Sequence, residues 1–331
     1  MEAGQIFETL AYQQGGKVNE FLLQFAAVAE STGARCYLVG GVVRDLLLSK
    51  CPDELDFVVE QDAVEFVGRL YRDWNELFPG VPAISKPVTF KRYKTAKFQF
   101  RSPVGVVRRE VNPLGRELQS VDFATAREEK YPVPGGVPEI VWSNIEQDLW
   151  RRDFSINSIA VPVTRSLTGQ VLDPSGGIAD LNLKALRVLH ERSFLDDPAR
   201  LIRAVRFSAR FGFSFEDRTR VLFEQALADS RLKTLPLSRL FDEFRKALSE
   251  RSPAMVLELM RGYGMLDQIL PLAANLNSVK TIAPGECRWE KVLAVLTCED
   301  SETALRGYLE SAKRSAADIR SVIEYRNQLG V

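Results

Sequence analysis

The stretch YLVGGVVRDLLLSKCPDELDFVVE, Tyr37–Glu60, decides the fold of the first half of the chain. It opens with a short apolar run that ends in a Gly-Gly pair, which is typical of a strand followed by a turn. The spacing of apolar residues predicts a helix over Val43–Leu48. Glu54 and Asp56 then open a second apolar run, which predicts another strand. Residues two apart on a strand point to the same face, so these two carboxylates converge.

Converging carboxylates allow two interpretations. An acid-x-acid pair by itself is typical of a solvated strand end. Two acids that face each other repel unless a cation lies between them, and their hard oxygens favour Mg²⁺. The turn at Gly40-Gly41 exposes backbone N–H groups to an anion, and Arg44 adds positive charge. A metal beside a phosphate cradle indicates phosphoryl or nucleotidyl transfer, whereas the Gly-x-Gly-x-x-Gly dinucleotide fingerprint is absent.

Composition narrows the possible classes. The 331 residues are 45% hydrophobic, enough for one to three domains with a real core. No stretch of 18 apolar residues occurs and the N-terminus lacks a signal pattern, so we expect no membrane span. Four scattered cysteines predict a reduced, cytoplasmic protein. The 44 basic and 44 acidic residues argue against indiscriminate nucleic-acid binding, and one histidine, His190, disfavours histidine-dependent catalysis.

The chain changes character near residues 165–195. Before this point the pattern predicts mixed helices and strands, with helices over 1–35 and 63–71 and strands over 97–100, 120–125 and 159–163. Residues 101–118 are polar and rich in Pro and Gly, which predicts a loop or arm. From Asp197 onward the pattern is helical. We therefore expect three domains, at 1–164, 165–252 and 253–331.

Several longer motifs follow the opening stretch in order. They are RRDFSINSIAV (151–161), LDPSGGIADL (172–181), LRVLHERSFLDDPARLIRAVRFSARFGF (186–213), LSRLFDEFRKAL (237–248) and GYGMLDQILP (262–271). With them the chain resembles the class II tRNA nucleotidyltransferases, which comprise the CCA-adding, CC-adding and A-adding enzymes and the bacterial poly(A) polymerases of the polymerase β-like superfamily. The resemblance implies an α+β fold: a catalytic head with a small mixed or antiparallel sheet, then an all-α neck and body.

The resemblance also implies a metal site. Glu54 and Asp56 stand at the two metal-ligand positions, where the family normally has Asp at both. The extra methylene of Glu54 moves its carboxylate by about one bond length, and positioning errors near 1 Å can cost about 10²-fold in rate. A catalytically weakened RNA- or nucleotide-binding relative is therefore an alternative. Asp122 is a candidate third acid, or else a polar residue on a half-buried strand.

A nucleotide site follows from the same resemblance. Its expected residues are Gly40, Gly41, Arg44, Asp45, Arg151, Arg152, Asp153, Asn157, Asp197, Arg200 and Arg203. Guanidinium groups grip phosphate bidentately, which suits Arg151 and Arg152 to the triphosphate. The resemblance implies that Asp153 selects ribose, and Asn157 fixes the local turn or contacts the ligand.

Asp197 and the arginines after it carry the remaining information. Asp197 before Pro198 is a good helix cap, and capping alone would explain it. Arg200, Arg203, Arg206 and Arg210 form one stripe, which is usually a solvated face or a salt-bridge row. The resemblance implies instead that Asp197 and Arg200 read the Watson–Crick edge of CTP and ATP, with Asp196 orienting Arg200.

Taken together, the motifs predict Mg²⁺-dependent, template-independent addition of C, A or both to the 3′ end of tRNA from CTP and ATP, with release of pyrophosphate. Poly(A) polymerase is the close alternative. The segment Arg127–Val141 resembles the family's flexible loop at full length, which argues against poly(A) polymerase and against a CC-only enzyme. Downstream basic residues would hold the RNA: Arg220, Arg239, Arg245, Arg261 and Lys280. We expect a short or missing tail after Val331.

Overall fold

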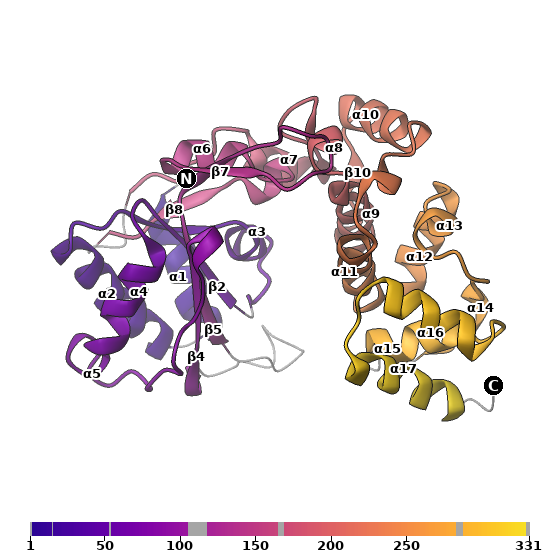
Figure 1. Ribbon diagram of the computed structural model, residues 1–331. Helices are drawn as coiled ribbons and strands as arrows, with labels where there is room; N and C mark the ends of the chain where they lie inside the picture. Colours follow the sequence, from indigo (N-terminus) through magenta and orange to yellow (C-terminus); the bar gives the residue numbers. More distant parts are fainter. Residues whose placement is uncertain are drawn as a thin grey trace. The chain divides into compact units, whose positions relative to one another are not determined.

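The chain folds into two compact units (Figure 1). The computed structural model describes residues 2–14, 16–52, 54–104, 118–164, 169–282 and 287–328. One unit comprises Met1–Lys130 with Pro138–Leu183, and the other comprises Tyr131–Val137 with Lys184–Val331. These units do not coincide with the expected divisions after residues 164 and 252, which stay predictions. The expected class, an α+β head followed by helices, is confirmed.

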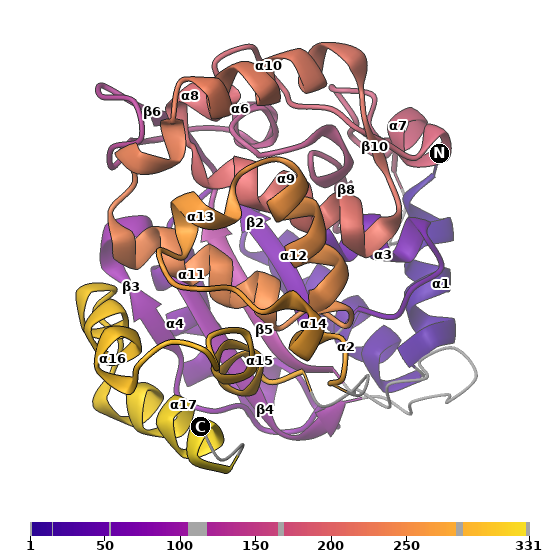
Figure 2. The same ribbon diagram turned by 90° about the vertical axis from the view of Figure 1, so that its right-hand side faces the viewer.

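A mixed sheet organises the first unit. Within the described residues it has six strands in the order β3-β4-β5-β2-β1-β8. Their bounds are β1 Cys36–Val39, β2 Glu54–Val59, β3 Val88–Phe90, β4 Thr95–Val104, β5 Leu118–Thr125 and β8 Ala160–Pro162. β2 and β5 pair in parallel, and the other neighbouring strands pair antiparallel. β4, β5 and β2 consequently lie side by side (Figure 2).

One face of this sheet is covered by helices and filled with phenylalanines. The helices of the first unit are α1 Ala3–Gln14, α2 Gly16–Ser31, α3 Gly41–Leu47, α4 Ala63–Arg72, α5 Trp74–Leu77, α6 Ile145–Trp150 and α7 Gly177–Leu183, with 3₁₀ turns η1 Lys91–Tyr93 and η2 Ser155–Asn157. Phe25 of α2 lies 4.9 Å from Phe57 of β2 and 5.6 Å from Phe123 of β5, measured between ring centroids. Phe66 of α4 completes the cluster. The odd-numbered side chains of β2 therefore face α2 and α4.

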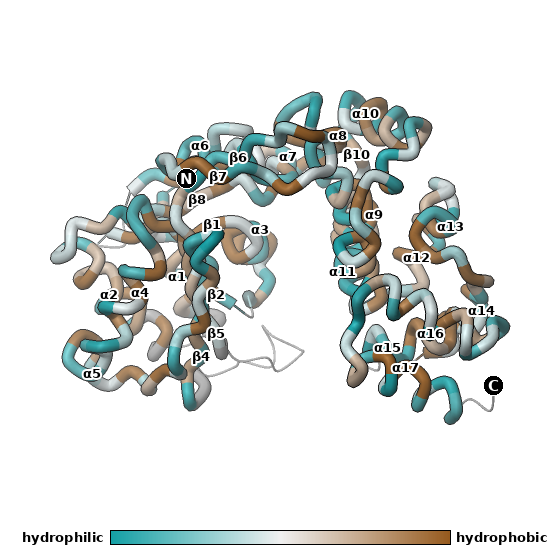
Figure 3. Tube along the Cα trace, viewed as in Figure 1, coloured by the Kyte–Doolittle hydropathy of each residue, from teal (hydrophilic) through white to brown (hydrophobic). Residues whose placement is uncertain are grey.

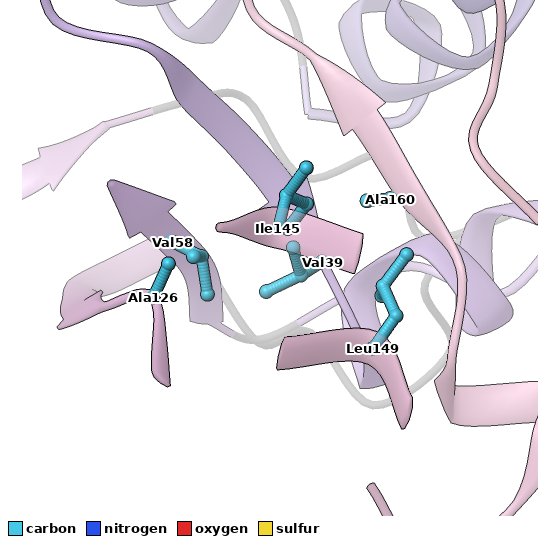
Figure 4. Packing of buried hydrophobic residues seen from close by; sticks show 6 residues of the cluster. All are labelled: Val39, Val58, Ala126, Ile145, Leu149 and Ala160. Atoms are coloured by element: carbon cyan, nitrogen blue, oxygen red, sulfur yellow. The ribbon is translucent and has the colours of Figure 1, made fainter. Parts of the chain in front are cut away.

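The opposite face of β2 changes from apolar to polar along the strand. At its carboxyl end Val58 packs with Val39, Ala126, Ile145, Leu149 and Ala160 (Figure 4). Because side chains alternate along a strand, Asp56 and Glu54 lie on this same face, nearer the start of β2. The apolar cluster thus ends where the two carboxylates begin.

Two predicted loops are partly wrong. Arg101–Val104 belong to β4 and Leu118 to β5, because pairing resumes at Val104 and Leu118 after an irregularity. Residues 105–117 of the expected arm lie outside the described residues. The expected flexible loop contains a hairpin of β6 Arg127–Lys130 and β7 Glu139–Trp142, stabilised by four registered residue pairs. Residues 131–138 lie between these strands, and Tyr131–Val137 belong to the second unit.

The second unit is helical, with hydrophobic and hydrophilic residues alternating along its tube (Figure 3). Its helices are α8 Ser193–Asp196, α9 Ala199–Phe211, α10 Asp217–Ala228, α11 Leu237–Leu248, α12 Pro253–Gly262, α13 Leu266–Ile269, α14 Leu276–Val279, α15 Trp289–Leu296, α16 Glu302–Ser311 and α17 Ala316–Gln328. The 3₁₀ turn η3 Arg231–Thr234 and the strands β9 Ala185–Leu186 and β10 Ser214–Phe215 complete it. α9 packs on α11 and α12, and Phe241 of α11 contacts Trp289 and Tyr308.

Candidate active site

Strand register gathers the acids of the first unit. Parallel pairing of β2 with β5 sets Asp56 opposite Asp122, and antiparallel pairing of β4 with β5 sets Lys97 opposite Asp122. Paired residues on neighbouring strands share a face of the sheet. Glu54, Asp56, Asp122 and Lys97 therefore form one cluster, called here the carboxylate face. The structure thus brings the expected third acid next to the first two.

Lys97 is shared by two of the three acids. Its Nζ lies 2.9 Å from Glu54 Oε1 and 2.9 Å from Asp122 Oδ2. Ser120 Oγ donates a second hydrogen bond to Glu54 Oε1 at 3.1 Å. The longer side chain of Glu54 is thereby drawn toward β5 and β4. Among the described residues, no hydrogen bond or ion pair reaches the carboxylate of Asp56.

The electrostatics of the carboxylate face favour an additional cation. Burial raises the pKa of Asp56 from 3.8 to about 6, and repulsion by Asp122 and Glu54 adds to the increase, while Arg152 and Lys97 oppose it. Burial also raises the pKa of Asp122, against the effect of Lys97. One ammonium group thus pairs with two of the three carboxylates, and the carboxylate oxygens are the hard donors that divalent ions prefer.

The residues fit a divalent ion by donor chemistry, but they are not arranged as a finished metal site. In the described ranges, no group of three or more His, Cys, Asp or Glu side chains is positioned to hold a metal ion. Lys97 Nζ contacts both Glu54 and Asp122 on this face. Asp56 and Asp122 are paired residues on adjacent strands, whereas Glu54 and Asp122 would both have to give up their contact with Lys97 to hold an ion.

The glycine turn lies directly against arginine side chains. Gly40 has φ of 70°, and a Cβ there would lie 2.7 Å from Arg152 Nη1. A Cβ at Gly41 would lie 3.4 Å from Arg44 Nη2. One expectation is corrected, because the N–H of Gly40 donates to the carbonyl of Ile159 and is not open to an anion. The glycines here give room to guanidinium groups.

Asn157 links two other expected site residues. Arg44 donates from Nη1 to Asn157 Oδ1 at 2.7 Å, and Asn157 donates from Nδ2 to Asp153 Oδ1 at 2.9 Å. Arg44 also pairs with Asp45 at 2.8 Å and is almost completely buried. This network favours a scaffolding role for Asn157, Arg44 and Asp45. Phosphate binding by Arg44 stays a prediction.

Asp148 is a residue that sequence reasoning missed. Its buried carboxylate accepts from Arg151 Nη2 at 2.7 Å through Oδ1 and from Arg152 Nη2 at 2.8 Å through Oδ2. Burial alone would raise the pKa of Asp148, but the two guanidinium groups hold it below its usual range. One acid thus orients both arginines that are expected to bind triphosphate. The i, i+3 and i+4 spacing on α6 is the sequence signal that could have revealed it.

The structure separates the arginine stripe of α9 into different roles. Arg206 and Arg210 pair with Glu250 at 3.4 and 2.6 Å, so this part of the stripe is a salt-bridge row. Arg203 lies 3.8 Å from Glu243. Arg200 is buried and donates to the hydroxyl of Ser193.

Two neighbouring residues form ion pairs that the sequence did not predict, and the role of Arg239 in RNA binding stays a prediction. Asp196 pairs with Arg192 at 2.9 Å, so the structure does not support its expected pairing with Arg200. Arg239, expected on an RNA path, lies 2.9 Å from Asp197 Oδ1. Two other residues of that path also have partners within the unit: Arg261 donates to the carbonyl of Ala274, and Lys280 pairs with Glu258.

Comparison with known proteins identifies the family. Residues 36–187 match the family described as Poly A polymerase head domain, and residues 212–276 match the probable RNA and SrmB-binding site of polymerase A. A CC-adding tRNA nucleotidyltransferase of Deinococcus radiodurans is 32% identical over 288 residues, which cover 85% of this chain and 68% of that protein. The chain belongs to the tRNA nucleotidyltransferase and poly(A) polymerase family. Enzymes of this family generally use divalent metal ions.

Other members of the family extend the likeness. An A-adding tRNA nucleotidyltransferase of Aquifex aeolicus is 38% identical over 237 residues, 71% of this chain and 26% of that protein. A solved tRNA nucleotidyltransferase with a primer tRNA and an incoming ATP analog has a TM-score of 0.67 at 29% identity, covering 92% of this chain and 84% of that one. The chain spans 26%, 24% and 56% of the lengths of three A-adding relatives. No helix among the described residues is long and apolar enough to cross a membrane.

Proposed function

We propose that this protein is a Mg²⁺-dependent nucleotidyltransferase that adds C, A or both to the 3′ end of tRNA from CTP and ATP, without a nucleic-acid template. The observation that carries the proposal is the carboxylate face, where Asp56, Asp122 and Glu54 lie together beside Lys97. Arg152 lies close enough to this face to lower the pKa of Asp56. A cation site next to a guanidinium suits a substrate that carries a triphosphate.

In the proposed reaction, bound divalent ions would supply activation of the terminal 3′-hydroxyl and stabilisation of the departing pyrophosphate. Asp56, Asp122 and Glu54 would hold these ions. Arg151 and Arg152, oriented by Asp148, bind the triphosphate, and Asp153 accepts from ribose hydroxyls. Asp197 and Arg200 read the base, the first by accepting from an exocyclic amine and the second by donating to ring acceptors. CTP and ATP carry such an amine, whereas UTP and GTP have a carbonyl at the corresponding position.

We also propose a cytoplasmic location. None of the four cysteines, all of which lie in the described part of the chain, forms a disulfide, which supports a reducing compartment. The Glu at position 54 and its ion pair with Lys97 do not by themselves favour a weakened, non-catalytic relative. Asp56 and Asp122 remain next to each other, and their mutual repulsion favours binding of a cation.

Incubation with truncated tRNA tests the proposal. Transcripts ending before the CCA sequence, after its first C and after both C residues are incubated with each of the four nucleoside triphosphates, with Mg²⁺ or with a chelator. We expect incorporation of C or A that depends on Mg²⁺ and stops at the natural end. Long poly(A) tails on unstructured RNA would favour poly(A) polymerase instead. A folded protein that incorporates nothing with any divalent ion would contradict the proposal.

A further inference from the structure

The side chain of Asp197 is held from two directions. It accepts through Oδ1 from the backbone N–H of Ala199 at 3.1 Å, within its own segment, and from Arg239 Nη2 at 2.9 Å. Arg239 lies in the first turn of α11, a separate helix of the same unit. Neither a hydrogen bond nor an ion pair to Asp197 Oδ2 occurs within the described residues. One oxygen of Asp197 is therefore anchored twice, while the other keeps its acceptor capacity.

This anchoring matters because the carboxylate of an Asp side chain rotates easily about its last torsion. The last side-chain torsion of Asp has broad, two-fold preferences, so a single cap hydrogen bond leaves considerable freedom. A charge-assisted hydrogen bond from a guanidinium is shorter and stronger than a neutral one and fixes geometry as well as charge. The pair of donors from Ala199 and Arg239 thus limits the directions in which Oδ2 can point.

The packing of α9 against α11 does not depend on the ion pair between Arg239 and Asp197. The side chain of Arg239 is 36% exposed and that of Asp197 is 15% exposed, so water reaches the guanidinium and screens the ion pair more than it screens a fully buried one. α9 and α11 are already joined by buried apolar residues, among them Leu201, Phe241 and Phe244. Arg206 of α9 and Glu250, which follows α11 in the chain, add a buried ion pair. A role for Arg239 in orienting Asp197 is therefore separable from a role in holding the helices together.

We propose that Arg239 is a positioning residue for base selection: it fixes Asp197 so that Oδ2 meets the exocyclic amine of the incoming nucleotide. This inference rests on the proposed function, in which Asp197 reads the base. Without the guanidinium the carboxylate rotates, and its preference for an amine over a carbonyl weakens. Arg239 then acts on the choice among nucleotides and not on the chemical step.

The test compares variants of the full chain. Arg239→Met removes the guanidinium and keeps a side chain of similar length, and Arg239→Lys keeps the charge without the fork. Arg231→Met is the matched control, because Arg231 forms an ion pair with Asp229 at 3.1 Å and its side chain is 32% exposed. For each protein kcat/KM is measured with CTP, ATP, UTP and GTP, the Kd values of CTP and UTP are measured without primer, and the melting temperature is recorded.

We expect Arg239→Met to lower the ratios of CTP to UTP and of ATP to GTP by about 5-fold or more, the lower end of the roughly 5- to 150-fold discrimination of a good polar contact to a base edge. Arg239→Lys should recover part of the ratio, and Arg231→Met should leave it unchanged. Unaltered ratios in Arg239→Met, or an equal loss with all four nucleotides together with a lower melting temperature, would overturn the inference.

Asp197→Asn separates this inference from the proposed base reading. Asn caps a helix about as well as Asp, so the helix start should survive. If Asp197→Asn keeps the wild-type ratios, base reading by Asp197 fails, and the role of Arg239 fails with it. If Asp197→Asn lowers the ratios and Arg239→Met does not, only the role of Arg239 fails. We expect the two changes together to do no more than Asp197→Asn alone, because Arg239 acts through Asp197.

Discussion

The carboxylate face of the first unit and the start of α9 and its neighbours in the second unit neutralise their acids in different ways. On the carboxylate face of the first unit, Lys97 serves both Glu54 and Asp122, and the pKa of Asp56 is raised to about 6. Around α9 in the second unit, Asp197 pairs with Arg239, and Glu250 pairs with two guanidinium groups. The first arrangement has too little positive charge and is suited to accepting a cation. The second is locally balanced and is suited to holding side chains in place.

The largest effect is expected at Asp56. Asp56→Asn should lower nucleotide incorporation by about 10³-fold or more, because metal stabilisation of the transition state contributes several kcal/mol. Steady-state incorporation measures it. Asp73→Asn, an exposed acid of the same unit, is the control and should keep full activity.

Asp56 should support activity but lower the stability of the folded protein when its carboxylate is charged. Its pKa rises from 3.8 to about 6 on folding, so between these pH values the folded state keeps a proton that the unfolded state has lost. The free energy of unfolding of the wild type should therefore fall as the pH rises through this range. Denaturation of Asp56→Asn should show a smaller fall, and an identical pH dependence in both proteins would show that Asp56 is not destabilised.

Loss of Asp148 should cost stability as well as activity. Asp148→Ala leaves the partly buried guanidinium groups of Arg151 and Arg152 without their shared acid, and breaking such a buried pair typically costs about 3–5 kcal/mol. Because the pKa of Asp148 is lowered on folding, its contribution is present above the unfolded pKa and is lost as the pH falls through the folded value. Chemical denaturation followed by tryptophan fluorescence measures the change.

The control for Asp148 lies on the same helix. Glu146 is exposed, and Glu146→Ala should change stability by no more than about 0.5 kcal/mol. Equal stability of Asp148→Ala and Glu146→Ala at neutral pH would mean that Asp148 does not hold the two arginines.

Lys97 should compete with a divalent ion. Lys97→Met removes the ammonium between Glu54 and Asp122, so we expect about tenfold tighter binding of Mn²⁺, equivalent to ~1.4 kcal/mol. The metal-free protein should melt at a lower temperature, and added Mn²⁺ should reverse that loss. Lys94→Met is a close control, because Lys94 pairs with Asp62 at 2.7 Å with similar exposure. Weaker Mn²⁺ binding in Lys97→Met would mean that Lys97 helps to hold the ion.

The smallest effect is expected at Glu54. Glu54→Asp should change metal-free stability by less than about 1 kcal/mol, since its side chain is 53% exposed in the ion pair with Lys97. The rate should stay the same or rise, because Asp is the usual residue of the family at this position. A large loss of incorporation would show that this active site has adjusted to the longer side chain.

The periodicity of the sequence predicted the first strands and helices correctly. Contacts between segments far apart in the chain could not be predicted in this way. The two-residue period of strands placed Glu54 and Asp56 on one face, and the helical spacing gave α3 and α4. Lys97 reaches the same face only because β5 lies between β2 and β4, an order that no local period reveals. The ion pair of Arg239 was not predicted for a similar reason, since its partner Asp197 lies on another segment of the unit.

Titration of Mn²⁺ into the metal-free protein tests the central claim most directly, namely that the carboxylate face binds divalent ions. Isothermal calorimetry would be run on the wild type, Asp56→Asn and Asp73→Asn at one pH above 6, where Asp56 is largely ionised. The account predicts saturable binding to the wild type and to Asp73→Asn, and loss of that binding in Asp56→Asn. Binding of the same stoichiometry and affinity in Asp56→Asn would contradict it.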